Sequence, residues 1–435
     1  MTSSMPARAR AEVPLGHTWP FFMPCPAGVE QLLAQELVTL LGHEPPGLSC
    51  RRAGVAWRGT WQQMMQANLH SRLAQRVLVQ LSDTPYRQEQ DIYEAARQVA
   101  WERWFTPRQT FKIEITAQHS PLKSLNFAAL RVKDAVADHF RDRRGERPSV
   151  EVKFPDVRVY VHLTAERMTL ALDTSGEPLF KRGWRVEKGD APLKETLAAA
   201  MLAASGWSQS LDGQPAAVER GVPLYDPCCG SGTIAIEAAQ IACRMAPGLQ
   251  RRFAFEKLLP FDKADWAACL QQARSLQCAP RAEVYGSDVA FRMVDFARHN
   301  AERAGVAQAV HLRGGDALQR MPPGETPGFL MVNPPYGERI DVGGVARAGG
   351  RQQAQMVRMG TAPGSTGGES AGDFFQQLAS HWKKNFPGWT AWVLSPDPRL
   401  PGQMRLKESR RVPMWNGPIE CRLFRFDLVA GRMAS

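Results

Sequence analysis

In the first part of the chain, short apolar runs typical of strands alternate with stretches whose apolar residues recur at helical spacing. Short apolar runs predict strands, and stretches whose apolar residues recur every three or four positions predict helices. The predicted elements are strands at 19–23, 54–57 and 76–81 and helices at 30–41 and 61–69. This β-α-β-α-β order is typical of a ferredoxin-like unit. We therefore predict a small α+β domain over residues 19–82.

A second α+β pattern follows over residues 83–180. Its most regular strand, Phe111-Lys112-Ile113-Glu114-Ile115, alternates apolar and polar side chains. The predicted elements are helices at 92–99 and 126–140 and strands at 111–115, 150–152, 158–163 and 167–173. This order indicates a second domain. Residues 1–18 contain no apolar leader and are predicted to form a disordered tail.

From residue 181 the pattern changes to short apolar strands that end in polar residues. Strands are predicted around 224–226, 282–288, 310–316 and 330–332, with an amphipathic helix at 191–206 that packs on the sheet. The alternation of strands and helices predicts an α/β domain over residues 181–435. Ligands bind such open sheets at the carboxyl ends of their strands.

The turn after the first of these strands carries candidate binding chemistry, and reads Asp226-Pro227-Cys228-Cys229-Gly230-Ser231-Gly232-Thr233. Gly230 and Gly232 let a ligand approach the backbone, where a side chain would collide with it. The turn is shorter than a dinucleotide fingerprint and lacks a P-loop Lys, so a pyrophosphate is disfavoured. Asp226 suits a cationic ligand such as S-adenosylmethionine (SAM). Any turn between strand and helix can contain Gly, so a purely structural role stays open.

Two further carboxylates stand at predicted strand ends. Asp288 could accept hydrogen bonds from both ribose hydroxyls of a nucleoside cofactor, and Asp316 could accept one from the adenine amine. Each Asp alone is more often a helix cap or a turn residue. Their common position at strand ends favours the cofactor interpretation.

The strand at 330–332 runs into Asn333-Pro334-Pro335-Tyr336, which fits a site for a planar amine. An exocyclic amine of a nucleobase is a poor nucleophile, because its lone pair is delocalised into the ring. The Asn333 side-chain oxygen and the Pro334 carbonyl can accept hydrogen bonds from the amine, and Tyr336 can stack on the base. Pro334 and Pro335 hold the backbone rigid. The alternative is a strand followed by an ordinary Pro-rich turn.

Taken together, these motifs resemble those of the class I methyltransferases with an N-terminal THUMP domain, in particular the bacterial N2-guanine methyltransferases of 23S ribosomal RNA. The likeness extends over most of the chain. It rests on 22–30, 172–176, 181–185, 191–195, 226–233, 246–248, 253–256, 333–338 and 416–421.

The resemblance implies a fold, a cofactor and roles for individual residues. The fold is a class I (Rossmann-like) methyltransferase sheet preceded by a ferredoxin-like and THUMP RNA-binding module, and the cofactor is SAM. The chain resembles a single-activity version of proteins that can carry a second methyltransferase domain. The implied catalytic residues are Asn333, Pro334, Pro335 and Tyr336. The implied cofactor-binding residues are Asp226, Cys228, Gly230, Gly232, Thr233, Asp288, Asp316 and Asn333.

Two departures from the family pattern stand near the site. Cys228-Cys229 is a pair where one cysteine is common, and we expect Cys229 to be a small buried residue. A Gly-, Ala- and Ser-rich insertion occupies residues 341–372, directly after the amine-binding motif. Its composition predicts a mobile surface loop, with a substrate lid as the alternative.

Composition narrows the class of protein further. The 435 residues include eight cysteines without C-x-x-C spacing, which argues against a metal site and predicts a reducing, cytoplasmic location. No apolar run reaches the length of a membrane span. The net charge of +11 favours nucleic acid as partner, here ribosomal RNA, and no obligatory protein partner is inferred. The strand-like Arg422-Leu423-Phe424-Arg425-Phe426 could present a basic face to phosphates or simply a soluble surface.

Candidate RNA contacts cluster in the predicted THUMP region, around a Pro-containing turn and a helix start where phosphate could meet side chains and free N–H groups. They are His119, Lys123, Asn126, Arg131 and Lys133. For any one of these residues, a solvated surface position is the simpler interpretation.

The sequence therefore predicts an enzyme that methylates the exocyclic N2 amine of a guanine in 23S ribosomal RNA. The Asn-Pro-Pro-Tyr motif serves N6-adenine methylation of RNA or DNA equally well, so that alternative stays open. A third hypothesis is a non-catalytic RNA-binding factor of ribosome assembly.

Overall fold

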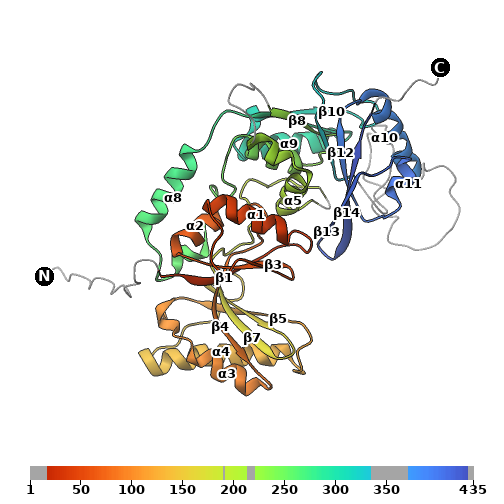
Figure 1. Cartoon of the computed structure of the whole chain (residues 1–435). Coiled ribbons are helices and arrows are strands. Elements are labelled where there is room, and N and C mark those ends of the chain that lie inside the picture. Colours follow the sequence, from red (N-terminus) through yellow and green to blue (C-terminus); the bar gives the residue numbers. More distant parts are fainter. Residues whose placement is uncertain (1–16, 190–191, 213–220, 335–370, 430–435) are drawn as a thin grey trace, which may run out of the picture. The chain divides into compact units, whose positions relative to one another are not determined.

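The computed structural model describes residues 17–189, 192–212, 221–334 and 371–429 (Figure 1). Its contacts divide the chain into two units. Unit 1 comprises Met1–Gly183 and Arg244–Gln277, and unit 2 comprises Trp184–Cys243 and Cys278–Ser435. Residues 244–277, which the sequence prediction placed in the methyltransferase domain, thus pack with the amino-terminal part of the chain.

Unit 1 is built on one seven-stranded sheet of order β2-β3-β1-β4-β7-β6-β5. The strands are β1 Trp19–Pro24, β2 Ser49–Arg51, β3 Gly54–Gly59, β4 Leu78–Pro85, β5 Phe111–Ala117, β6 Val157–Leu163 and β7 Arg167–Asp173. The helices are α1 Glu30–Leu41, α2 Trp61–His70, α3 Glu89–Gln98, α4 Leu125–Arg144 and α8 Lys263–Ser275, with short 3-10 turns η1 Trp101–Arg103 and η2 Ala254–Lys257.

The two predicted amino-terminal domains share this sheet. Strand β4 contains the predicted boundary at 82/83 and pairs with β1 on one side and with β7 on the other. Most predicted elements are present, and α1 has the predicted bounds. The strand predicted at 150–152 is wrong, because only Val150 bridges to Phe111 and the chain then turns away. Val152 and Phe154 are 65% and 85% exposed, so no partner covers their apolar alternation.

A buried polar network joins the end of β7 to α2. The Asn68 side chain donates to Thr174 Oγ1 at 2.9 Å and accepts from Ser175 Oγ at 2.6 Å. The Ser175 carbonyl accepts from Arg251, and the Thr174 carbonyl accepts from the Phe255 N–H. Residues 172–176, one of the blocks on which the family resemblance rests, therefore connect three parts of unit 1.

We predict that Asn68→Ala lowers the free energy of unfolding by about 2 kcal/mol, because it removes the acceptor of the buried Ser175 hydroxyl and one donor to Thr174 Oγ1. Chemical denaturation followed by hydrogen exchange at residues of unit 1 measures the change. Gln271→Ala, on the exposed face of α8, is the control and should change the free energy of unfolding by less than about 0.5 kcal/mol. Equal stabilities of the two variants would contradict a structural role for the network.

Unit 2 contains a second seven-stranded sheet, of order β10-β9-β8-β11-β12-β14-β13. Its strands are β8 Gly221–Asp226, β9 Ala282–Asp288, β10 Val310–Gly314, β11 Phe329–Val332, β12 Thr390–Ser395, β13 Arg410–Asn416 and β14 Ile419–Asp427. Its helices are α5 Glu195–Ser205, α6 Trp207–Asp212, α7 Thr233–Ala242, α9 Phe291–Arg303, α10 Ala371–Asn385 and α11 Leu400–Met404, with the 3-10 turn η3 Ala307–Ala309.

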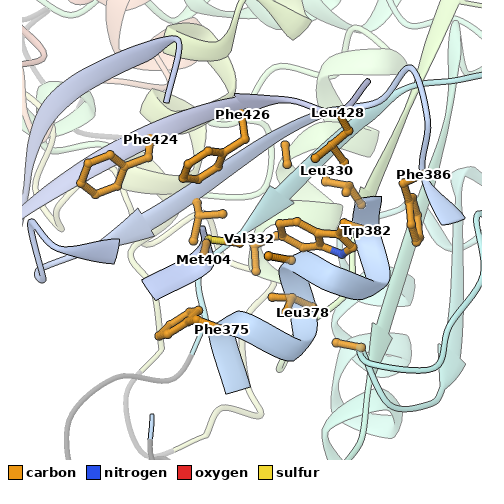
Figure 2. Close-up of a cluster of buried hydrophobic side chains, with 14 of the residues drawn as sticks. Leu330, Val332, Phe375, Leu378, Trp382, Phe386, Met404, Phe424, Phe426 and Leu428 are labelled. Carbon is orange, nitrogen blue, oxygen red and sulfur yellow. The ribbon is translucent and has the colours of Figure 1, made fainter. Parts of the chain in front are cut away.

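The strands from β10 to β12 run parallel, and β14 and β13 add an antiparallel edge. Helices α10 and α11 pack on the sheet through a large apolar cluster that includes Leu330, Val332, Trp382 and Phe426 (Figure 2). Central strands β11 and β12 are buried over almost their whole length, as expected when both faces of a parallel sheet are covered. This cluster holds β11, and with it the start of the Asn333 motif, in a rigid core.

Candidate active site

The proposed cofactor loop and the proposed amine-binding motif lie at the same edge of the unit 2 sheet. Strands β8 and β11 are parallel neighbours, with Leu330 opposite Tyr225. Two residues after Leu330 the strand ends and Asn333 follows, while β8 ends at Asp226. Because neighbouring parallel strands end at the same edge, Asn333 and the loop from Pro227 to Gly232 lie at one edge of the sheet, the edge at which such sheets bind ligands.

The Gly-rich loop is fixed by its neighbours as well as by its own sequence. Gly230 and Gly232 have φ angles of +53° and +90°, which a side chain would disfavour. The Gly230 N–H donates to Asp288 Oδ2 at 2.9 Å, and the Cys229 N–H donates to the Ser287 carbonyl at 2.8 Å. The end of β9 thus determines the conformation of the loop after β8.

Three carboxylates surround this loop. Asp226 is 1% exposed and accepts from the Cys228 N–H at 3.1 Å. Asp288 also accepts from the Ala290 N–H, and Asp316 accepts from the Leu318 N–H, both at 2.9 Å. Asp288 and Asp316 therefore have the turn role that the sequence left open, and each of the three carboxylates retains lone pairs for a ligand. In their ionised form these carboxylates favour a cationic ligand.

Cys228 and Cys229 lie in the same buried, acidic surroundings as these carboxylates. Cys228 is half-buried in the loop and Cys229 is buried, as predicted. Burial raises the pKa of the Cys228 thiol well above its usual range, and Asp226, Asp288 and Asp316 raise it further. A thiol in such surroundings stays protonated and is a poor nucleophile.

Asn333 has the strongest sign of a ligand-binding role. Its Oδ1 atom is buried and makes no hydrogen bond within the described part of the chain. A buried acceptor without a donor is costly in a finished protein interior, and a ligand group can supply the missing donor. Pro334 is also buried. Pro335, Tyr336 and residues up to 370 of the predicted insertion lie outside the described residues.

A buried ion pair that sequence reasoning missed supports the start of α7. Arg185 Nε lies 2.9 Å from Glu195 Oε1, and these side chains are 12% and 4% exposed. The same guanidinium donates to Thr233 Oγ1 at 2.7 Å. Thr233 follows the Gly-rich loop directly, so Arg185 connects the segment before α5 to the loop. Arg185 and Glu195 belonged to the resemblance blocks, but no spacing rule in the sequence pairs them.

Asn300 is a second supporting residue that the sequence analysis missed. It is fully buried in α9, and its amide donates to the Ser231 carbonyl and to the Glu187 carbonyl, both at 3.0 Å. Its Oδ1 accepts from the Val186 N–H at 3.3 Å. Asn300 therefore holds the Gly-rich loop and the segment before α5 in a fixed relation.

Exposed apolar side chains beside Asp288 also escaped the sequence analysis. Val289 and Phe291 are 57% and 72% exposed, although they directly follow a strand-end carboxylate. Such side chains offer a flat apolar surface where a purine could pack. The signal was available in the sequence, because three apolar residues, Val289, Ala290 and Phe291, directly follow Asp288.

The candidate RNA contacts divide into two groups. His119, Lys123 and Asn126 are exposed around the start of α4, and His119 has a φ of +58°. Arg131 already donates to Gln90 Oε1 and lies over the Tyr93 ring, and Lys133 pairs with Asp134. Within the part of the chain that the structure describes, no side-chain bond engages the first three residues, whereas Arg131 and Lys133 would have to exchange partners to meet a phosphate.

The strand around Arg425 carries little free charge. Arg422 pairs with Glu420 and Arg425 with Asp427, each at 2.9 Å. These ion pairs neutralise the basic face of β14, and the arrangement is that of a soluble strand surface.

Parallel strands, a Gly-rich loop between strand and helix, and carboxylates at three strand ends define a class I methyltransferase sheet. Family models agree: an RlmL ferredoxin-like domain matches residues 20–78, a THUMP domain 86–173 and an RMKL-like methyltransferase domain 182–348. The putative RNA methyltransferase slr0064 of Synechocystis is 35% identical, over 94% of this chain and 97% of the relative. The chain belongs to the RlmL-type methyltransferases that contain a THUMP domain.

Two further comparisons show how similar the chain is to known proteins in sequence and in structure. The ribosomal RNA large subunit methyltransferase K/L of Methylococcus capsulatus is 36% identical over 95% of this chain, which spans only 52% of that relative's length. The crystal structure of SMU.472, a putative methyltransferase complexed with SAH, has a TM-score of 0.78 and 24% identity, covering 96% of this chain and 99% of that one.

The comparisons confirm the predicted fold class, a ferredoxin-like and THUMP module followed by a Rossmann-like methyltransferase sheet. Membership of this family gives SAM as cofactor, and the protein is a SAM-dependent RNA methyltransferase. SAM supplies a methyl group on a positively charged sulfonium. The acidic loop surroundings and the apolar pair after Asp288 fit that cofactor. Among the described residues, no group of His, Cys, Asp or Glu is placed to hold a metal ion, and no helix could cross a bilayer.

Cofactor affinity should depend on pH through Asp226. Burial raises the pKa of its carboxyl well above the usual range, the Cys228 N–H lowers it and Asp288 raises it. A cationic cofactor favours the ionised form, so SAM should bind more tightly as pH rises through this raised pKa, with release of a proton. Calorimetry in two buffers of different ionisation enthalpy measures that release. Asp226→Asn should bind SAM more weakly and release no proton at this step; unchanged proton release would assign the titration to another group.

Proposed function

We propose that this protein transfers the methyl group of SAM to the exocyclic N2 amine of a guanine in large-subunit ribosomal RNA. The K/L relatives carry the name of ribosomal RNA large subunit methyltransferases, which supports the substrate. The observation that carries the chemistry is the buried Asn333 Oδ1, which no described residue bonds and which lies at the same sheet edge as the Gly-rich loop.

In this proposal Asn333 Oδ1 and the Pro334 carbonyl accept hydrogen bonds from the two amine hydrogens. These bonds orient the nitrogen lone pair toward the methyl carbon. The sulfonium is already a strong electrophile, so the main contribution of the protein is alignment of nitrogen, methyl and sulfur. Tyr336 is proposed to stack on the base. A base within a duplex cannot reach such a site, so the target is unpaired or flipped out.

The deciding experiment compares ribosomal RNA from cells with and without the gene. Nucleoside analysis should find one N2-methylguanosine missing from large-subunit RNA, and purified protein with labelled SAM should restore it on bare RNA or on a precursor particle. Loss of N6-methyladenosine instead would establish the adenine alternative. Full rescue of a growth or assembly defect by Asn333→Ala, with no methyl mark, would favour the non-catalytic RNA-binding factor.

A further inference from the structure

Unit 1 contains a groove that the proposed site residues do not line. Its volume is about 1450 Å³. One wall comes from β1 and β4, a second from the stretch between α3 and β5 with the end of α4, and the third from residues 256–263. Small-molecule pockets usually enclose roughly 300–1,000 Å³, so the dimensions favour an extended ligand.

Among the described residues that line the groove, the charged side chains without an ion-pair partner are cations. Four lining cations, all exposed, form no ion pair within the described ranges of the chain: Arg103, Arg108, Arg144 and Lys263. The lining carboxylates, in contrast, are engaged. Glu102 contacts His139 Nε2 at 2.5 Å, Asp156 pairs with Lys257 at 2.7 Å, and Glu256 pairs with Arg252 at 2.9 Å. An anionic ligand would therefore meet free cations and satisfied acids.

The groove also offers half-buried indole rings. Trp19 and Trp104 line it, and buried Trp61 contacts both, with ring centroids 5.6 Å and 6.1 Å away. Free cations beside partly exposed aromatic rings are the combination by which proteins bind single-stranded nucleic acid, with phosphates on the cations and bases on the rings. A duplex would hide its bases from the rings, and an acidic peptide would leave them unused.

We propose that this groove binds a single-stranded segment of the RNA substrate. Arg103, Arg108 and Lys263 contact its phosphates, and Trp104 stacks on one of its bases. The inference rests on the RNA methyltransferase function proposed above and adds a second RNA contact, distinct from the start of α4. Lys263 is the first residue of α8 and belongs to residues 244–277, which lie within the methyltransferase region of the sequence but pack with unit 1. In this proposal, that segment supplies part of an RNA site of unit 1.

The first test reverses charge in the groove of the full-length protein. The triple variant Arg103→Glu, Arg108→Glu, Lys263→Glu is compared with Arg51→Glu, Arg52→Glu, Arg274→Glu, which changes the same net charge at exposed positions of unit 1 outside the groove. The probe is an oligouridylate of about twelve nucleotides. The groove variant should lose at least about tenfold in affinity. The slope of log affinity against log salt concentration should become smaller by about 2, because each lost phosphate contact contributes roughly 0.7. Equal losses in the two variants would overturn the proposal.

The second test examines stacking and does not depend on net charge. Trp104→Ala should weaken oligouridylate binding by about tenfold, whereas Trp104→Phe, which keeps a ring, should stay within about threefold of the parent. Thermal unfolding of both variants separates misfolding from lost stacking. Equal affinity of the parent for duplex RNA, or competition by polyglutamate as strong as that by RNA, would refute a single-stranded RNA site.

The experiments can contradict the groove proposal and the methylation proposal independently of each other. If the protein methylates ribosomal RNA but neither the charge nor the Trp104 variants affect oligouridylate binding, the groove proposal is wrong and the function stands. If no RNA is methylated but the groove variants lose binding as described, the groove is an RNA site and the methylation proposal is wrong.

Discussion

Asn333→Ala is expected to lower kcat for methyl transfer by about 100- to 1,000-fold, the usual effect of removing one preorganised hydrogen-bonding group from an active site. The side-chain oxygen at this position is buried and unpartnered, so its loss removes an acceptor without breaking a bond inside the described protein. Stability should therefore change little. Single-turnover transfer from labelled SAM to substrate RNA measures kcat, and calorimetry measures SAM affinity, where we expect a much smaller effect.

Asn333→Asp is the matched variant, because it keeps the shape and an acceptor oxygen but replaces the amide with a carboxyl group. It should lose less activity than Asn333→Ala. Retention of activity within tenfold by the alanine variant would show that the amine is oriented by other groups, and would remove the main support for the proposed chemistry.

The second large effect is expected at Gly230. Among the described residues, a Cβ atom built there would have only Met293 Cε within 4 Å, at 3.9 Å, so this part of the protein leaves space beside Gly230. If the cofactor occupies that space, Gly230→Ala should raise the Kd for SAM by about 30-fold, which corresponds to about 2 kcal/mol. Gly232 is less informative, because a Cβ there would already lie 3.0 Å from Ala297 Cβ and disturb the fold.

Gly206→Ala is the control for Gly230→Ala. Gly206 follows α5 in the same unit, has a φ of +82° and would place its Cβ in open space. Both substitutions carry a similar backbone strain of about 1–2 kcal/mol, but only Gly230 stands in the loop. Similar Tm values with a weakened Kd only for Gly230→Ala are the expected result. An unchanged SAM Kd in Gly230→Ala would mean that the cofactor does not approach this part of the loop.

The local features of the site could be predicted from the sequence because they depend on short-range rules. Glycines with positive φ, a carboxylate at the end of a strand and an apolar run before Asn333 each have a signature within about ten residues. Their assembly at one edge followed from a general property of parallel sheets, and the β8–β11 pairing bears it out. The roles of the individual side chains toward cofactor and base remain predictions for the variants above to test.

The supporting contacts could not be predicted in this way, because their partners are far apart in the sequence. Arg185 meets Thr233, and Asn300 meets the carbonyls of Ser231 and Glu187. No periodicity or motif joins such positions. The strand predicted at 150–152 failed for the same reason, since its alternation is real but no neighbouring strand extends along it.

By itself, the sequence determined most strands and helices of the amino-terminal part, four strands of the second sheet, the loop and amine-binding motifs, and the surplus of positive charge. These depend on backbone propensity and side-chain chemistry that act locally. Only the tertiary structure decided that β4 pairs with β7 to merge two predicted domains into one sheet, and that residues 244–277 pack with unit 1. It also decided which cations are left without partners. Those outcomes depend on packing between distant segments, where the burial of apolar surface and the pairing of buried polar groups select one arrangement among many.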